Sequence, residues 1–457
     1  MKPPRQLEQL ARLLPEGELR REPEVLEKYA GDKWFARHLP EAVALPRSAA
    51  SVARVLRFAS AHRLAVTARG AGCGYVGGCV PERGGIVLSL ERMNRIKEIH
   101  AGDFVAVAEA GVILQTLQEA VERRGLYYPP DPASRADCSV GGTVATNAGG
   151  PRCLKYGVTR DYVLGLQAVL AEGAVVSLGG RTHKNKTGFD LTRLLVGSEG
   201  LLGVVTEVTL KLLPLPPSRA MLAAGFDSMK AAARAMRAIF AAGYLPCALE
   251  VADEFTLQAA GRRTGNRRLE GSRALLMVEL DGREEPVRSE ALALGRLLGA
   301  QGPVFIQRAR GREECERLWA LRREFSYALR DTGLVKLNED IVVPRGRLED
   351  LFAFTARLQR KTGLSIACFG HAGDGNIHVN VMYDDKEPGA GQRTRQVLDQ
   401  LFRQVLAWEG VITGEHGIGL AKKPWWPLAV APAVRALHGR IKHALDPKGI
   451  LNPGKFV

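Results

Sequence analysis

The glycine-rich segment TARGAGCGYVGG, residues 67–78, constrains the fold of this chain more than any other feature of its sequence. It contains a G-x-G-x-x-G pattern, which in a Rossmann fold joins a strand to the helix whose N-terminus binds a dinucleotide pyrophosphate. Apolar residues 64–68 predict the strand, but residues 84–93 predict a second strand where the helix should be. The loop would then hold phosphate through consecutive backbone N–H groups. A flexible surface loop is the alternative explanation of this segment taken alone.

Two further segments, residues 129–157 and 197–208, are also rich in glycine and carry few side chains that could form a core. Three such loops suit a long cofactor that the main chain approaches closely. In this order they resemble the FAD-binding domain of the vanillyl-alcohol oxidase type, also called the p-cresol methylhydroxylase type, over roughly residues 40–216. The resemblance implies FAD as the cofactor, and it leaves no glycine motif that would support NAD.

The positions that match this family fall into three groups. The pyrophosphate side is matched by Arg69, Gly70, Ala71, Gly72, Cys73, Gly74, Gly77 and Gly78. The isoalloxazine side is matched by Pro130, Asp131, Pro132, Gly141, Gly142, Asn147, Ala148, Gly149 and Gly150. The adenine side is matched by Gly197, Ser198, Glu199, Gly200, Gly203 and Val205. Some members attach flavin covalently through a histidine in the first loop. This chain has Cys73 there and no histidine, so we expect non-covalent FAD.

The double proline at 216–217 predicts a domain boundary. We predict a helical segment over residues 1–39, the FAD-binding domain over 40–216, and a substrate and metal domain over 217–457. Beyond the prolines, helical patterns such as SMKAAARAMRAIFAAG alternate with strands such as ALLMVEL, which predicts further α+β material. The expected fold is therefore α+β with two domains, the second of them ferredoxin-like.

A histidine pair stands in the segment LSIACFGHAGDGNIHVNVMY, which predicts a β-hairpin with Asp374-Gly375 as a two-residue turn. In that register His371 faces His378, and opposed side chains share a sheet face with Cβ atoms about 4.5–5.5 Å apart. Two imidazoles so placed can bind one metal ion, and Glu415, between glycines, is available as a third ligand. Two structural histidines that face each other by chance are the alternative.

The pattern G-H-x-G-D-G-N-x-H followed by G-E-H-G resembles the C-terminal domain of FAD-linked oxidases, which include D-lactate, glycolate and D-2-hydroxyglutarate dehydrogenases. The resemblance implies a divalent metal (Zn, Mn or Fe) on His371, His378 and Glu415. It also implies that Asn376 contacts the substrate and that His416 is the catalytic base. Asn452, in the sequence LDPKGILNPGKFV, matches the segment that returns to the flavin, within roughly the last 45 residues.

A carboxylate-binding segment is matched by WALRREFSYALRDTGLVKLNEDIVVP, in which Arg322 follows W-x-L. The family arginine at this position binds the substrate carboxylate. The second basic position of the family is variable, and the spacing allows Lys336 or Asn338; we favour Lys336. An arginine on a solvated helix surface is the alternative, and it is the preferred interpretation for Arg323.

The charge and cysteine content exclude some classes of protein. The net charge is +15, yet no basic run is interleaved with aromatic residues, which favours a solvated basic surface over a nucleic-acid site. Seven cysteines without a C-x-x-C pattern argue against a disulfide framework and an iron–sulfur cluster. We find neither the apolar core of a signal peptide nor an apolar run of about 18 residues. A cytoplasmic protein is predicted, with at most peripheral association with the inner membrane face.

These features together predict an FAD-dependent oxidoreductase. It would oxidise a small 2-hydroxy acid, glycolate or D-lactate, to the 2-oxo acid by hydride transfer to flavin N5, and it could form a homo-oligomer. A separate iron–sulfur subunit, a quinone or a soluble carrier would accept the electrons. Two alternatives stay open: a non-redox flavin enzyme such as alkyl-glycerone-phosphate synthase, and a non-catalytic flavin subunit of an oxidase complex. Nucleic-acid binding would rest on charge alone.

Overall fold

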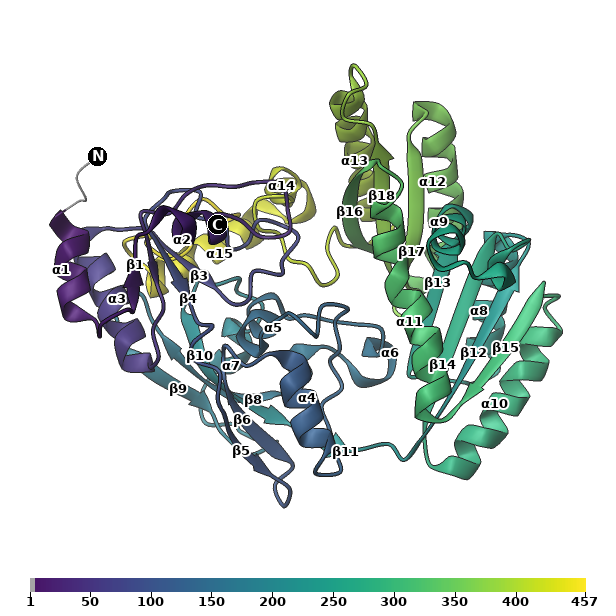
Figure 1. Cartoon of the computed structure of the whole chain (residues 1–457), viewed down its shortest axis with the longest axis horizontal. Coiled ribbons are helices and arrows are strands. Elements are labelled where there is room, and N and C mark those ends of the chain that lie inside the picture. The colour runs from purple at the N-terminus through teal and green to yellow at the C-terminus, as the bar shows by residue number, and fades with distance from the viewer. Residues whose placement is uncertain (1–4) are drawn as a thin grey trace. The chain divides into compact units, whose positions relative to one another are not determined.

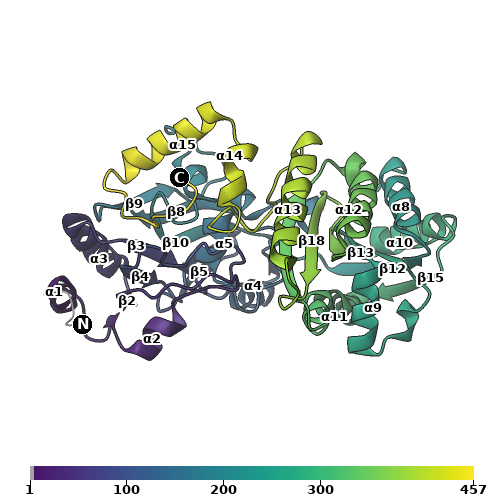
Figure 2. The same ribbon diagram turned by 90° about the horizontal axis from the view of Figure 1, so that it is seen from above.

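The structure is a computed structural model that describes residues 5–457; residues 1–4 of the predicted N-terminal helical segment lie outside the described residues. The chain forms two compact units (Figures 1 and 2). Unit 1 comprises the chain up to Ala148, Val158–Leu215 and Glu415–Val457, and unit 2 comprises Gly149–Gly157 and Pro216–Gly414. The chain therefore passes from one unit to the other four times.

Unit 1 is built on two main sheets. Its strands are β1 (Leu19–Arg20), β2 (Ala42–Ala44), β3 (Val66–Arg69), β4 (Ile86–Ser89), β5 (Ile96–His100), β6 (Val105–Glu109), β7 (Leu126–Tyr127), β8 (Val163–Val169), β9 (Val175–Gly179), β10 (Val204–Lys211) and β11 (Leu213–Pro214). The first sheet has the order β1-β2-β4-β3, with β4 parallel to both β2 and β3. The second has the order β5-β6-β10-β8-β9 and is antiparallel, and β7 pairs with β11.

The helices of unit 1 are α1 (Arg5–Leu13), α2 (Pro23–Lys28), α3 (Ala49–His62), α4 (Leu114–Glu122), α5 (Val140–Thr146), α7 (Leu191–Leu195), α14 (Trp426–Ala429) and α15 (Pro432–Leu445), with 3-10 turns η1 (Thr159–Asp161) and η4 (Lys423–Trp425). Helix α3 begins after Ser48, whose hydroxyl caps the helix by accepting a hydrogen bond from the N–H of Ser51 at 3.2 Å. Its apolar face is buried against the first sheet, in a core that includes Val52, Leu56 and Leu88. The predicted strand–loop–strand arrangement around the first glycine loop is confirmed: β3 ends at Arg69, and the next element of the described chain is β4.

Unit 2 is one antiparallel sheet with helices on both faces. Its strands are β12 (Ser218–Phe226), β13 (Ala248–Asp253), β14 (Ala274–Gly282), β15 (Phe305–Arg310), β16 (Val335–Val342), β17 (Ser365–His371) and β18 (Asn376–Tyr383). Its helices are α6 (Cys153–Tyr156), α8 (Met229–Ala241), α9 (Glu254–Thr264), α10 (Glu284–Gly299), α11 (Gly311–Arg330), α12 (Leu348–Thr362) and α13 (Ala390–Ala407), with 3-10 turns η2 (Arg267–Leu269) and η3 (Arg345–Arg347). The strand order is β15-β12-β14-β13-β17-β18-β16.

Two helices, α9 and α11, cover one face of this sheet, and α8, α10, α12 and α13 pack on the other. The α9/α11 face carries an apolar core that includes Leu257, Trp319, Phe325, Phe369 and Met277. The sheet and helix content of both units is that of an α+β protein, as the sequence predicts.

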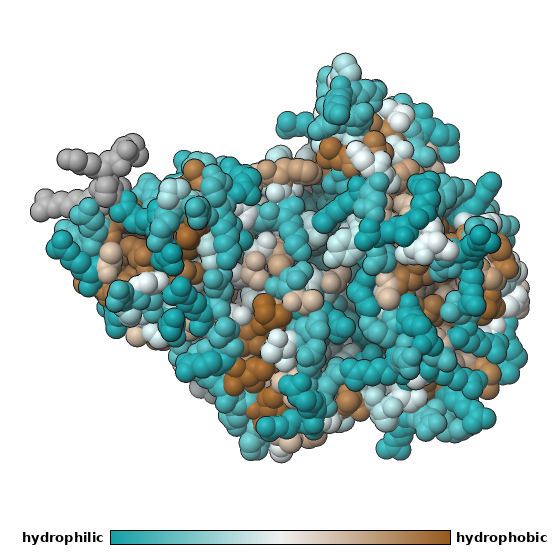
Figure 3. Space-filling view, in the orientation of Figure 1, coloured by the Kyte–Doolittle hydropathy of each residue, from teal (hydrophilic) through white to brown (hydrophobic). Residues whose placement is uncertain are grey.

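One face of the molecule is mostly polar. Figure 3 shows hydrophilic side chains over much of one face, interrupted by smaller hydrophobic patches. No helix within residues 5–457 combines the length and the apolar character needed to cross a bilayer.

Candidate active site

Three glycine-rich loops meet in unit 1. We name them loop 1 (residues 69–78), loop 2 (residues 130–148) and loop 3 (residues 197–205). Loop 1 approaches loop 2 at Gly70, where an added Cβ atom would lie 2.5 Å from Ser139 Oγ and 3.3 Å from Gly142 Cα. Loop 2 is tied to loop 3 because the N–H of Glu199 donates to the carbonyl of Ala145 at 2.8 Å. Predicted flavin-binding positions from each of the three loops are therefore neighbours within unit 1, although they are far apart in the sequence.

Asn452 joins the C-terminal segment to this group of loops. Its side-chain amide donates to the carbonyls of Gly78 (2.9 Å) and Glu199 (2.8 Å), and its backbone N–H donates to Val66 of β3 (2.7 Å). Asn452 adopts a left-handed backbone with φ 45°, which asparagine tolerates better than most residues. One residue thus connects loop 1, loop 3 and the first sheet.

Loop 1 offers consecutive backbone donors. Within residues 5–457, no protein group accepts a hydrogen bond from the backbone N–H groups of residues 70–74. A cavity of about 260 Å³ borders this stretch and is lined by Gly70, Ala71 and Ser139, among others. Gly72 has φ +73°, which turns the backbone as a concave phosphate-binding loop requires. Loop 1 therefore has the donors and the adjoining space that an anionic group needs.

Several predicted cofactor residues support the loops from within the protein. Arg69 donates to the carbonyl of Gly31 at 2.6 Å and lies 3.3 Å from Cys79 Sγ. The carboxylate of Glu199 accepts the N–H groups of Ile418 and Gly419, both at 2.8 Å. Burial raises the pKa of Glu199, and these two hydrogen bonds oppose that rise. Glu199 thereby holds the segment that follows His416.

The other matched positions are mostly backbone features of the loops. Gly141 donates to the carbonyl of Ala110, and a Cβ atom on Gly141 would lie 2.5 Å from Ala110 Cβ. Asn147 ends α5 in a left-handed conformation and accepts the N–H of Arg160. Asp131 of loop 2 is buried. In loop 3, Gly200 has φ +72° and Val205 lies on β10. Gly149 and Gly150 begin the segment Gly149–Gly157, which belongs to unit 2.

The histidine hairpin forms, but its predicted register is wrong. His371 lies opposite Asn376, and His378 lies opposite Phe369, so the two histidines are diagonal neighbours rather than a directly opposed pair. The turn spans residues 372–375 instead of Asp374-Gly375 alone, because the N–H of Gly373 donates to the carbonyl of Leu249 on β13 and leaves the ladder. A shift by two residues keeps both imidazoles on one face of the sheet. Their ring centroids are 5.6 Å apart.

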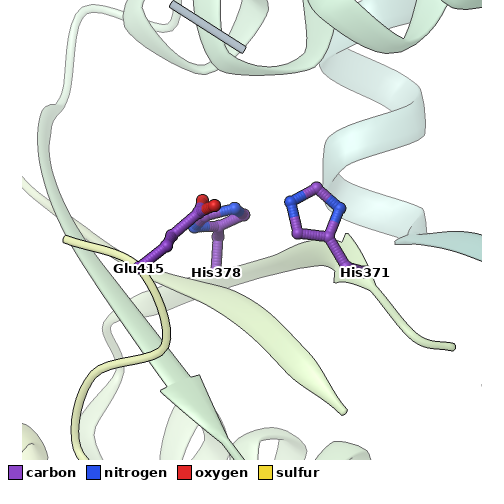
Figure 4. Close-up of side chains that lie close together, drawn as sticks. All are labelled: His371, His378 and Glu415. Atoms are coloured by element: carbon purple, nitrogen blue, oxygen red, sulfur yellow. The ribbon is translucent and has the colours of Figure 1, made fainter. Parts of the chain in front are cut away.

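Glu415 lies beside this pair. It directly follows Gly414, the last residue of unit 2, whose N–H donates to the Asp340 carboxylate at 3.0 Å. The possible ligand atoms of His371, His378 and Glu415 all lie within 4.8 Å of one another (Figure 4). Asp340 also faces His378 across the β16–β18 ladder. The three predicted metal ligands are thus brought together around one point.

Glu250 is a residue of this region that the sequence interpretation missed. It lies on β13 opposite His371, with 1% of its surface exposed. Its carboxylate is 2.6 Å from His371 Nδ1 and accepts a hydrogen bond from Arg322 Nε at 2.6 Å. Burial alone would raise the pKa of Glu250, but the charges and hydrogen bonds of His371 and Arg322 lower it to about 2. A glutamate inside the apolar strand sequence ALEVAD was the available signal.

Arg322 is buried on α11, so the surface-helix alternative is wrong for it. Its guanidinium lies over the Phe369 ring at 4.8 Å, and within residues 5–457 no acceptor binds its two terminal nitrogens. Arg323, by contrast, is partly exposed and pairs with Glu316, as its preferred interpretation predicts. Arg322 therefore presents free N–H donors from a fixed position.

The remaining predicted catalytic residues form hydrogen bonds or ring contacts with other residues of the protein. Lys336 Nζ donates to Ser326 Oγ at 2.7 Å, and burial, reinforced by the charge of Arg330, lowers its pKa to about 7. Asn376 donates its side-chain amide to the carbonyl of Ile341 at 3.0 Å. His416 lies in unit 1, where its ring stacks on Tyr75 of loop 1 at a centroid distance of 5.3 Å.

The glycine loops offer backbone N–H donors, and two histidines of unit 2 meet the carboxylate of Glu415. These features together define a class of nucleotide-cofactor enzymes with a candidate metal centre. The chain belongs to the FAD linked oxidases: the family model of their C-terminal domain matches residues 215–456. The model of an FAD binding domain matches residues 40–179. The predicted family is thereby confirmed.

Proteins similar to this chain over most of its length agree with that family. The glycolate oxidase subunit GlcD of Bacillus subtilis is 38% identical to this chain, over 92% of this chain and 89% of the length of GlcD. The D-lactate dehydrogenase of Anaerostipes hadrus is 33% identical to this chain, over 95% of this chain and 93% of the length of the dehydrogenase. The solved structure of p-cresol methylhydroxylase has a TM-score of 0.77 at 18% identity, covering 99% and 96% of the two chains. At that identity the likeness concerns the fold, and it confirms the predicted p-cresol methylhydroxylase type.

Proposed function

We propose that this protein oxidises a small 2-hydroxy acid, such as glycolate or D-lactate, to the 2-oxo acid with FAD as the electron acceptor and a divalent metal as the activator. The convergence of His371, His378 and Glu415 beside the buried Arg322 carries the proposal. The chain is homologous to proteins named glycolate oxidase and D-lactate dehydrogenase, which supports this substrate class.

FAD would be held by the three loops of unit 1. The N–H groups of residues 70–74 suit its pyrophosphate, and loop 2 would border the isoalloxazine ring while loop 3 would border the adenine. Loop 1 has no histidine that could form the family's covalent bond, and burial raises the pKa of the Cys73 thiol, which disfavours the nucleophilic thiolate. The flavin is accordingly proposed to be non-covalent. When bound, FAD would accept the hydrogen of the hydroxyl-bearing carbon as a hydride.

The donor set of His371, His378 and Glu415 fits a divalent cation. Two imidazoles and one carboxylate form a three-ligand set that leaves a coordination position for substrate, as in catalytic zinc sites. These ligands would also accept Mn²⁺ or Fe²⁺. A cation there would polarise the substrate hydroxyl and lower its pKa.

The protein's own groups would bind and deprotonate the substrate. Arg322 has two terminal nitrogens available for a carboxylate, and a protonated Lys336 would supply a second positive charge. Asn376 would contact the substrate near the metal ligands. His416, the residue after Glu415, would take the hydroxyl proton on its imidazole. Loss of that proton together with the hydride leaves the 2-oxo acid.

Reduced flavin must be reoxidised by another molecule. We propose an iron–sulfur subunit, a quinone or a soluble carrier, because the seven cysteines of this chain offer no cluster motif. The relative named as a subunit of glycolate oxidase supports a protein partner. Association with a further copy of the chain, and peripheral contact with the inner membrane face from the cytoplasm, belong to the same proposal.

Non-redox flavin chemistry of the alkyl-glycerone-phosphate synthase kind is disfavoured by the names of the homologues, and so is a non-catalytic flavin subunit. The decisive experiment is anaerobic mixing of the purified yellow protein with D- and L-2-hydroxy acids. We expect the flavin absorbance near 450 nm to bleach with a small D-2-hydroxy acid or glycolate, as reduction by a donor requires. A flavin that stays oxidised with every acid would contradict the proposal.

A further inference from the structure

Glu250 occupies the centre of the sheet in unit 2. Strand register places it directly opposite His371, so both side chains leave the sheet on the same face, the one that α11 covers. Arg322 reaches this face from α11 and is 8% exposed. Three ionisable groups from three elements therefore meet in a place that excludes most water.

The two carboxylate oxygens of Glu250 serve different partners. Oε1 lies 2.6 Å from His371 Nδ1, and Oε2 accepts the N–H of Arg322 Nε at 2.6 Å. Both distances are typical of charge-assisted hydrogen bonds. Neither partner can move without loosening the carboxylate that holds the other.

The bond to His371 fixes which ring nitrogen carries hydrogen. An ionised carboxylate only accepts hydrogen bonds, so Nδ1 must be protonated in this pair. In its neutral form the imidazole then has its lone pair on Nε2, the form in which histidine binds a metal. On the other side, Arg322 uses only Nε for Glu250, so its planar guanidinium is held by one edge and its terminal nitrogens stay available.

We propose that Glu250 is a positioning residue shared by the two halves of the site: it sets the tautomer of His371 for the metal and the orientation of Arg322 for the substrate carboxylate. This inference rests on the proposed function. It predicts that one substitution at a residue touching neither metal nor substrate weakens the binding of both.

Unit 2 contains a matched control. Glu279 lies on the adjacent strand β14, is fully buried, and forms an ion pair with Arg152 at 2.9 Å. Within residues 5–457 no interaction links Glu279 to His371, and the guanidinium of Arg152 lies over the ring of Trp319 at 5.2 Å. Glu279→Gln removes the same charge from a similar environment, so it reports the cost of an uncharged side chain in this sheet without touching the proposed site.

The experiment compares Glu250→Gln and Glu279→Gln with the wild-type holoprotein. The protein is freed of metal with a chelator and titrated with Mn²⁺, and free Mn²⁺ is followed by electron paramagnetic resonance. We expect Glu250→Gln to raise the Mn²⁺ dissociation constant about tenfold to a hundredfold, because an amide replaces one of the two acceptor oxygens by an NH₂ donor and can no longer accept from each partner on its own oxygen. We also expect a higher KM for the 2-hydroxy acid, while Glu279→Gln leaves both constants within about threefold even where its Tm falls.

Glu250→Asp provides a second variant if the glutamine form is unstable. It keeps the charge but shortens the side chain by one methylene group, so we expect a smaller change in the same two constants. Unchanged Mn²⁺ affinity in both Glu250 variants, with the wild type binding normally, would overturn the inference and leave the proposed function standing. Equal losses in Glu279→Gln would also overturn it. A wild-type protein that binds no Mn²⁺ would instead overturn the metal part of the proposed function and this inference with it.

Discussion

At the scale of single residues, Lys336 is a group of the proposed substrate site whose charge responds to pH near neutrality. Its ammonium is bonded to Ser326 Oγ, and burial, with the nearby charge of Arg330, lowers its pKa to about 7 from the usual 10.5. A lysine attracts a carboxylate only while it is protonated. The proposed role of Lys336 therefore carries its own pH dependence.

We expect kcat/KM for 2-hydroxy acids to fall as the pH rises through about 7, because this constant reports ionisations of the free enzyme. In Lys336→Arg the fall should move to much higher pH, since a guanidinium stays charged. The same alkaline limb in wild type and variant would assign the ionisation to another group. The unfolded chain binds more protons than the folded one between about pH 7 and 10.5, so the stability contribution of Lys336 should rise with pH in that window.

His416 is the proposed base, and its ring stacks on Tyr75 of loop 1. We expect His416→Ala to lower kcat by about 10²- to 10⁴-fold, the usual contribution of a positioned general base. The flavin spectrum should remain, because the loop donors are backbone groups that this substitution leaves in place. His443→Ala, on the exposed helix α15, serves as the control and should keep full activity. An active His416→Ala protein would remove the residue from the mechanism, and a colourless one would show that it holds the flavin site together.

At the scale of elements, the close approach of loop 1 to the start of α5 is the feature most sensitive to a small change. Ser139 caps α5 by accepting the N–H of Gly142 at 3.2 Å, and Gly70 lies against both residues. Gly70→Ala would place a methyl group 2.5 Å from Ser139 Oγ. We expect the two loops to separate at a cost of about 1–3 kcal/mol, as for other overpacked sites.

That separation should weaken FAD binding about tenfold to a hundredfold, since each 1.4 kcal/mol is tenfold in affinity. The measurement is the fluorescence of the flavin that dissociates from the protein on dilution. Gly180→Ala is the matched control in the same unit, because its Cβ atom would meet no heavy atom within 4 Å and its backbone needs no positive φ. Equal flavin retention in the two variants would mean that the approach of loop 1 to α5 is not needed for cofactor binding.

Local sequence signals predicted individual elements of this fold well. Ser48 marks the start of α3, and the absence of a helix after loop 1 follows directly from its glycines and proline. The hairpin register was missed because its turn depends on a hydrogen bond from Gly373 to Leu249, which lies on a strand more than a hundred residues earlier. A dipeptide such as Asp374-Gly375 predicts a tight turn only when no neighbouring strand competes for its backbone.

The candidate site was predicted less completely than the fold, for the same reason. Motif spacing identified His371, His378 and Glu415, because their residue types reveal ligand chemistry. Glu250 and Asp340 act on those residues through pairings of β13 with β17 and of β16 with β18. Such pairings join residues far apart in the sequence, and their only local sign is a polar residue in an apolar strand, such as Glu250 in ALEVAD. The residues that support a site are therefore harder to find in a sequence than the proposed ligands.

At the scale of the whole molecule, the two proposed cofactors depend on different residues. The flavin-binding loops belong to unit 1, whereas two of the three proposed metal ligands, His371 and His378, belong to unit 2. The third, Glu415, is the first residue of the last segment of unit 1 and lies outside the three loops. Residues that would hold the metal therefore contribute nothing to the backbone donors of loop 1. The two groups should be removable independently of each other.

Chelation provides the test. In excess EDTA we expect activity to be lost, because the chelator removes the metal ion from the two histidines and the glutamate. The protein should keep its yellow colour, and its flavin should elute with it in gel filtration. Added Mn²⁺ or Zn²⁺ should restore turnover to the wild type but not to His378→Ala, whose ligand set is incomplete. Full activity in EDTA would contradict the proposed metal. Release of flavin together with the metal would contradict the independence of the two sites.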